Sequence, residues 1–138
     1  MARERRLSLS GTRVFVVEDE ALLVLALEDL LSDMGCDLVG HAQQLEDALS
    51  KASALDFDVA ILDVNLGGVR SDPVGEALAR RGIPFVFVSG YGEAALPAGF
   101  RDCPLVNKPY AAASLQAGLL QALGRRDPNA AASTAGSP

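Results

Sequence analysis

The stretch VFVVEDEALL, residues 14–23, predicts both the fold and the place of the functional site. It opens with four apolar residues, three of them β-branched, which is typical of a strand buried on both faces of a sheet. Three carboxylates follow at once: Glu18, Asp19 and Glu20. A solvated turn needs no such cluster, so the charge at the end of a core strand indicates that the strand leads into a site.

Along the rest of the chain, apolar runs and amphipathic segments alternate. The runs predict strands over residues 12–17, 36–42, 58–64, 84–90 and 104–108, and the amphipathic segments predict helices over residues 20–34, 44–54, 72–82 and 112–123. Residues 65–70, NLGGVR, predict a loop, after which Asp72 is expected as an N-cap with Pro73 at the first helical position. Pro97 and Gly99 leave room only for a short helix or an irregular segment over residues 91–103.

Strands that alternate with helices predict right-handed crossovers and a parallel sheet covered on both faces. The expected fold is α/β: a flavodoxin-like doubly wound sheet of five parallel strands, order 2-1-3-4-5, with a shortened fourth helix. We expect a flexible N-terminus over residues 1–10, one folded domain over 11–124 and a disordered tail over 125–138.

Composition narrows the classes of function. The net charge is -6 and the basic residues are scattered apart from three near the start, which argues against a nucleic-acid partner. No apolar run reaches the roughly 18 residues of a membrane span, and no signal peptide is visible, so a cytoplasmic protein with no membrane partner is expected. Cys36 and Cys103 are predicted to be reduced, packed thiols.

Polar residues collect at the carboxyl ends of four predicted strands. They are Glu18 and Asp19 after the first strand, Asp63 and Asn65 at the third, Ser89 at the fourth and Lys108 at the fifth. Each alone is typical of a turn residue, a helix cap or a surface lysine. In open parallel sheets, however, ligands bind outside the carboxyl ends of the strands, so the four positions together predict one site.

The residue types in this site indicate phosphoryl transfer. Two unit charges ~4 Å apart repel by about 4 kcal/mol at an effective dielectric of ~20, so Glu18, Asp19 and Asp63 require a cation to stay ionised together. Hard oxygen ligands suit Mg²⁺. A carboxylate can also act as a nucleophile toward phosphorus, with the metal, Lys108 and Ser89 stabilising the phosphoryl oxygens.

The four motifs VVEDE, AILDVNL, VSG and NKPY resemble those of receiver domains of two-component response regulators, and the resemblance covers about residues 12–123. The resemblance implies that Asp63 is the phosphoacceptor, that Asp19 binds Mg²⁺ directly, and that Glu18 acts mainly through a water of the metal. It further implies roles for three other positions: a metal ligand in the backbone carbonyl of Asn65, a switch hydroxyl in Ser89, and a phosphate partner in Lys108. The Lys108–Pro109 bond is expected to be cis.

The segment PFVFVSGYG, residues 84–92, is similar to a subgroup of stand-alone receivers with a Phe-Ala-Thr-Gly-Tyr signature. This implies a histidine kinase of HWE type, or a histidine phosphotransfer protein, as partner, and a monomer or weak dimer. One departure is Leu105, which stands where receivers usually place a mobile aromatic residue. Tyr91 is the favoured replacement, because glycines flank it, and Tyr110 is the second candidate.

Three functions stay open at this point. The first is a single-domain response regulator, without enzymatic activity on other molecules, that signals by contact or passes the phosphoryl group on. The second is a pseudo-receiver that binds partners without being phosphorylated. The third is a phosphatase with an aspartate nucleophile, which lacks its second Asp because position 65 is Asn.

Overall fold

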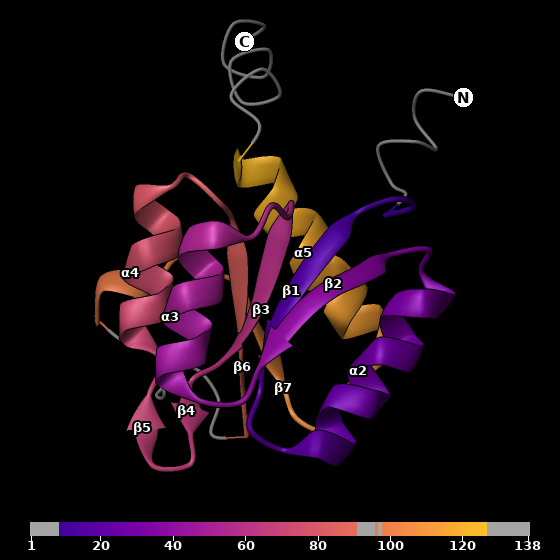
Figure 1. Ribbon diagram of the computed structural model, residues 1–138. Coiled ribbons are helices and arrows are strands. Elements are labelled where there is room, and N and C mark those ends of the chain that lie inside the picture. The colour runs from indigo at the N-terminus through magenta and orange to yellow at the C-terminus, as the bar shows by residue number, and fades with distance from the viewer. Residues whose placement is uncertain (1–8, 91–95, 97, 127–138) are drawn as a thin grey trace, which may run out of the picture.

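The computed structural model describes residues 9–90, 96 and 98–126. The elements are β1 (Arg13–Val17), α2 (Ala21–Asp33), β2 (Asp37–Ala42), α3 (Leu45–Ala54), β3 (Val59–Asp63), β4 (Asn65–Leu66), β5 (Val69–Arg70), α4 (Asp72–Arg80), β6 (Phe85–Ser89), the 3-10 helix η2 (Ala98–Phe100), β7 (Leu105–Asn107) and α5 (Ala112–Arg126). The four α-helices alternate with the strands of a central sheet, as the sequence predicts (Figure 1).

The central sheet has five parallel strands in the order β2-β1-β3-β6-β7. This is the predicted order 2-1-3-4-5, because β6 and β7 are the fourth and fifth strands of this sheet along the chain. The chain order reverses between β1 and β3, whose carboxyl ends lie at the lower edge of the sheet in Figure 1. The predicted place for a ligand site is therefore at this edge.

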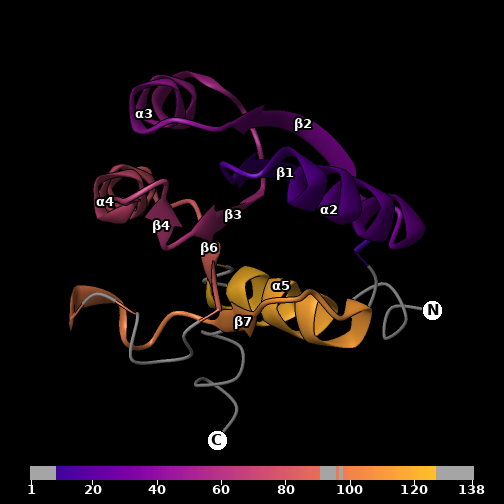
Figure 2. The same cartoon turned by 90° about the horizontal axis from the view of Figure 1, so that it is seen from below.

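Two helical layers cover the sheet, α3 and α4 on one face and α2 and α5 on the other (Figure 2). Strand β1 serves both layers, since Phe15 and Val17 point to the first and Val14 and Val16 to the second. Cys36 is buried in the second layer and forms no disulfide, as predicted. Among the described residues, no helix combines the length and the apolar character that crossing a membrane would need.

The prediction of a loop over residues 65–70 is wrong. Strands β4 and β5 form an antiparallel hairpin in which Asn65 pairs with Arg70 and Leu66 with Val69. Gly67 and Gly68 turn the chain with φ angles of 59° and 94°, a region that glycine enters without strain. Strands of two residues are too short to show the alternation of apolar and polar residues that predicts a strand, so the sequence pattern does not reveal them.

Several boundaries of helices and termini in the structure differ from the predicted ones. Helix α4 already includes Asp72, with Ser71 in the N-cap position, so the predicted cap is one residue late. Helix α5 continues to Arg126, beyond both the predicted helix end at 123 and the start of the predicted tail at 125. Leu9, assigned to the flexible N-terminus, is only 2% exposed and packs in the core beside α2 and α5. Residues 1–8 and 127–138 of the predicted termini lie outside the described residues.

A shortened helix is predicted for the segment between β6 and β7. The described residues of this segment, Leu96 and 98–103, contain only the 3-10 turn η2. Phe100 at the end of this turn packs edge-on against Phe85 and Phe87, with ring centroids 5.6 and 5.5 Å away. These aromatic contacts attach the segment to the sheet. The described part of the segment contains no full helix that could do so.

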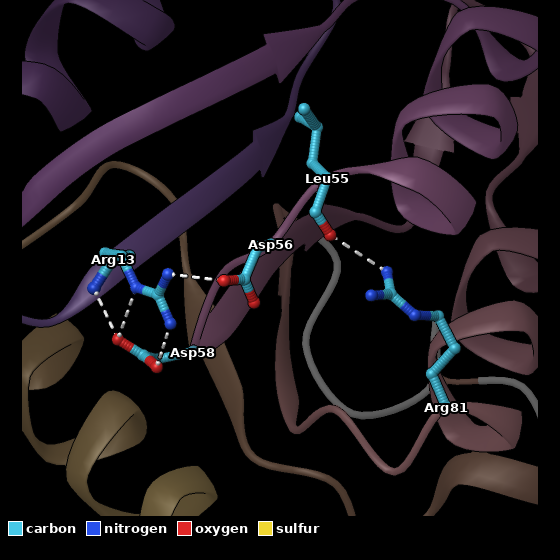
Figure 3. A network of polar contacts seen from close by, with 5 residues as sticks. All are labelled: Arg13, Leu55, Asp56, Asp58 and Arg81. Carbon is cyan, nitrogen blue, oxygen red and sulfur yellow. Dashed lines mark hydrogen bonds and ion pairs between the residues drawn. The ribbon is translucent and has the colours of Figure 1, made fainter.

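A polar network holds the opposite end of the sheet (Figure 3). Asp58 accepts hydrogen bonds from the backbone and the guanidinium of Arg13, which also binds Asp56 at 2.8 Å. Arg81 donates to the carbonyl of Leu55 at 3.1 Å and covers the Phe57 ring. These contacts fix the connection from α3 into β3, and so help to set the position of Asp63 at the other end of that strand.

Candidate functional site

The predicted site residues meet around one pocket at the carboxyl edge of the sheet. The pocket has a volume of about 530 Å³ and is lined by Asp19, Glu20, Asp63, Val64, Asn65, Gly67, Gly68, Arg70, Ser89, Gly90 and Lys108. Five of the six residues singled out from the sequence are in this set. The sixth, Glu18, is fully buried and is not among the lining residues.

Lys108 joins the two buried carboxylates. Its Nζ lies 2.8 Å from Oδ2 of Asp63 and 3.1 Å from Oε1 of Glu18. Burial alone lowers the pKa of Lys108, but the hydrogen bonds and charges of Asp63 and Glu18 outweigh it and raise the pKa above its usual range. Lys108 is therefore expected to carry its positive charge at neutral pH. The bond that follows it, Lys108–Pro109, is cis, as the resemblance implies.

Glu18 is held by three donors on the inner side of the site. Its Oε1 accepts from the Tyr110 hydroxyl at 2.9 Å and from Lys108, and its Oε2 accepts from the backbone N–H of Glu20 at 3.2 Å. A carboxylate that is 0% exposed needs such partners to offset the cost of its burial. The described contacts thus direct Glu18 toward Lys108 and Tyr110, away from the pocket.

Tyr110 is the site residue that the sequence placed least well, since it appeared only as a second candidate for a mobile aromatic. Burial first, and then the charge and hydrogen bond of Glu18, raise the pKa of Tyr110 well above its usual range. The phenol therefore stays protonated and donates to Glu18. Tyr110 follows Lys108 by two residues in the sequence, but nothing in that spacing identifies Glu18 as its partner.

We expect Tyr110→Phe to lower the free energy of unfolding by about 1–2 kcal/mol, because it removes a hydrogen bond to a buried charged acceptor that keeps two other donors. Urea unfolding measures the change. A double-mutant cycle with Glu18→Gln separates this bond from the packing of the ring. If Tyr110→Phe costs the same in the wild-type background and in the Glu18→Gln background, the hydrogen bond contributes nothing.

Asp19, Asp63 and Asn65 provide the oxygen atoms that a hard cation would need. Both carboxylates line the pocket, and Asp63 Oδ1 accepts from the backbone N–H of Asn65 at 3.2 Å. Asn65 also lines the pocket, so its backbone carbonyl is the candidate for a third oxygen ligand. Two carboxylates and one carbonyl fit Mg²⁺, which keeps several waters and binds few protein ligands.

A second grouping of acids competes with this ligand set. Glu18, Asp19 and Glu20 each offer a carboxylate oxygen, and these oxygens lie within 4.8 Å of one another. Glu18 is already bound to Lys108 and Tyr110, and the Glu20 side chain is exposed. Asp19 is the member common to both groupings and lines the pocket together with Asp63.

Ser89 ends β6 next to Asp63 and is 3% exposed, so its hydroxyl is placed on the pocket wall. Leu105 starts the neighbouring strand β7 and packs, half-buried, against the aromatic core under α3 and α4. The side chain at this position is thus part of the packing. Tyr91, the favoured aromatic for a switch, lies outside the described residues.

Comparison with known proteins agrees with this geometry. The family profile for the response regulator receiver domain matches residues 14–120. The chain is 32% identical over 118 residues to the phyllosphere-induced regulator PhyR of Methylorubrum extorquens, covering 82% of this chain and 44% of PhyR. It therefore spans less than half the length of that relative.

Two solved structures of receiver-type proteins are similar to the chain over nearly the full length of those proteins. The solution structure of SdrG from Sphingomonas melonis Fr1 is 40% identical with a TM-score of 0.69, covering 84% of this chain and 96% of SdrG. A BeF3-activated conformation of SdrG, from Pseudomonas melonis Fr1, is 38% identical with a TM-score of 0.68, covering 83% and 98%. With its sheet order and its rim of acids, lysine and serine, the chain belongs to the family of response regulator receiver domains.

Proposed function

We propose that the chain acts as a response regulator receiver that accepts a phosphoryl group on Asp63 in a Mg²⁺-dependent reaction. The observation that carries the proposal is the 2.8 Å contact between Lys108 and Asp63 in a pocket that Asp19, Asn65 and Ser89 also line. A carboxylate nucleophile, a cation, a hydroxyl donor and metal-binding oxygens thus surround one space.

In the proposed reaction, a carboxylate oxygen of Asp63 attacks the phosphorus of a phosphohistidine. A new O–P bond forms, the N–P bond breaks, and its electron pair returns to the imidazole nitrogen, which leaves. Lys108 and the Ser89 hydroxyl stabilise the phosphoryl oxygens, and Asp19, Asp63 and the Asn65 carbonyl are the groups that would hold the metal. A bound Mg²⁺ supplies further neutralisation of the phosphoryl charge.

The other two functions fit the site less well. A pseudo-receiver has no need of the aligned Asp19, Asp63 and Lys108, and a 38% identical relative has a BeF3-activated conformation. A phosphatase needs a general acid two residues after the nucleophile. The side chain of Asn65 instead accepts a hydrogen bond from Gly68 at 2.7 Å and supports the hairpin turn.

We further propose that the chain signals by protein contact or by phosphorelay, with a histidine kinase of HWE type or a histidine phosphotransfer protein as donor. The test is a donor profile: phosphorylated kinases and phosphotransfer proteins are offered to the chain in the presence of Mg²⁺. Borohydride trapping then locates the acyl phosphate. Label at residue 63 supports the proposal, and label at any other residue, or none from any donor, contradicts it.

The first turn of α2 is the proposed docking surface for the donor. Leu22 is 80% exposed and Leu25 is 57% exposed, directly beyond the acidic end of β1. Exposed leucines beside a reaction site are typical of a contact surface. We expect Leu22→Glu to slow transfer from the kinase about tenfold, because a charge replaces an apolar contact that docking would bury, and to leave labelling by acetyl phosphate unchanged.

Ala79→Glu is the matched control for this change, because Ala79 is exposed on α4, on the other face of the sheet. It adds the same charge to a helix without touching the proposed surface. Rates of labelling by kinase and by acetyl phosphate are measured for both variants. Equal slowing of the two donors by Leu22→Glu, or equal slowing by both variants, is incompatible with docking at α2.

A further inference from the structure

We propose that Arg70 is a second cationic ligand for the incoming phosphoryl group and gives the site a preference for highly charged phosphoryl donors. The inference deepens the proposed phosphorylation of Asp63 and rests on it. Arg70 was not singled out from the sequence, because it falls in a segment predicted to be a loop. The hairpin of β4 and β5 is what brings it to the pocket.

The hairpin gives Arg70 a defined position. Arg70 pairs with Asn65, and side chains directly opposite in an antiparallel pair lie on the same face. Leu66, on the other face, is 5% exposed and packs into the core. The face that carries Asn65 and Arg70 is therefore turned away from the core, toward the pocket that both residues line.

Two features keep the hairpin in this register. Asn65 Oδ1 accepts from the N–H of Gly68 at 2.7 Å, and the N–H of Ser71 donates to the carbonyl of Val64 at 3.0 Å, which closes the base of the hairpin. The guanidinium itself is oriented by Asp72, whose Oδ1 lies 3.2 Å from Nε of Arg70. Arg70 is thus held at the mouth of the pocket by the backbone and by an ion pair.

The charge balance of the pocket supplies a reason for a second cation. Three carboxylates line it, those of Asp19, Glu20 and Asp63, and the phosphoryl group adds up to two further negative charges. A bound Mg²⁺ would offset two of these charges and leave the pocket negative. Lys108 is already shared between Asp63 and Glu18. Among the described residues that line the pocket, Arg70 is the one other cation. Its planar guanidinium also matches the geometry of phosphoryl oxygens better than an ammonium does.

The experiment compares two small donors of different charge, acetyl phosphate, which is a dianion at neutral pH, and phosphoramidate, which carries less net charge. Second-order rate constants for labelling are measured by intact-mass spectrometry at low salt. We expect Arg70→Gln to slow labelling about tenfold with acetyl phosphate and about threefold with phosphoramidate, since a charge-assisted contact to the donor is lost. Arg70→Lys keeps the charge but lacks the planar guanidinium, so its labelling rates should lie between those of Arg70→Gln and the wild type.

Arg80→Gln is the control, because it removes the same charge from the exposed far end of α4. It should label like the wild type with both donors. Mg²⁺ titration in the absence of any donor gives an independent readout: Arg70→Gln should bind Mg²⁺ at least as tightly as the wild type, because it removes a repelling cation.

Equal rates for Arg70→Gln and the wild type with both donors overturn the inference. The inference is also overturned if Arg70→Gln slows labelling equally with both donors and weakens Mg²⁺ binding. That result would show that the substitution disturbs the hairpin. Failure of the proposed function looks different: the wild-type chain itself would then carry no label at residue 63.

Discussion

An Asp63→Asn protein is expected to gain no phosphate from acetyl phosphate in the presence of Mg²⁺, whereas the wild-type chain should gain one. Asp63 is the carboxylate that lines the pocket within 2.8 Å of Lys108, and asparagine of the same shape is no nucleophile toward phosphorus. The loss should therefore be complete within the detection limit of intact-mass spectrometry. Far-ultraviolet circular dichroism should show that the fold is retained, since Lys108 keeps its contact with Glu18.

Asp58→Asn is the matched control for this prediction. Asp58 lies just before the other end of the same strand, in the network with Arg13 shown in Figure 3. Its replacement weakens a partly exposed ion pair and should leave labelling unchanged. One phosphate on the Asp63→Asn protein, or an equal loss in both variants, would remove Asp63 from its proposed role.

The second large effect is expected at Asp19. Asp19→Asn should weaken Mg²⁺ binding at least tenfold, and the rate of labelling should fall with it, because one of two carboxylates proposed to bind the metal is lost. The amide chemical shifts near residues 19 and 63 report Mg²⁺ binding directly. The wild-type affinity should itself be weak, since much of the coordination is left to water and phosphate.

Glu20→Gln decides between the two groupings of acids. If the metal is held by Asp19, Asp63 and the Asn65 carbonyl, the exposed Glu20 can lose its charge with less than about a threefold change in affinity. If the cluster of Glu18, Asp19 and Glu20 holds the metal, Glu20→Gln and Asp19→Asn should weaken it alike. Unchanged shifts in the wild-type chain on adding Mg²⁺ would rule out both groupings.

The order of the five strands and the edge at which the site lies could be predicted from the sequence alone. Apolar runs report burial on both faces of a sheet, and polar residues at the ends of four runs must meet once the strands are parallel. Asp19, Asp63, Asn65, Ser89 and Lys108 could be placed at one pocket for this reason. The local pattern was sufficient because each of these residues ends, or closely follows, its own strand.

The partners of these residues, by contrast, became visible only in the folded chain. The bond between Tyr110 and Glu18 joins positions 92 residues apart, and no periodicity in either segment encodes it. Arg70 reaches the pocket through two strands of two residues each, which are too short to leave a repeating pattern. Contacts of this kind depend on how separate elements pack against one another, so the acids and the lysine could be found in the sequence while their anchors could not.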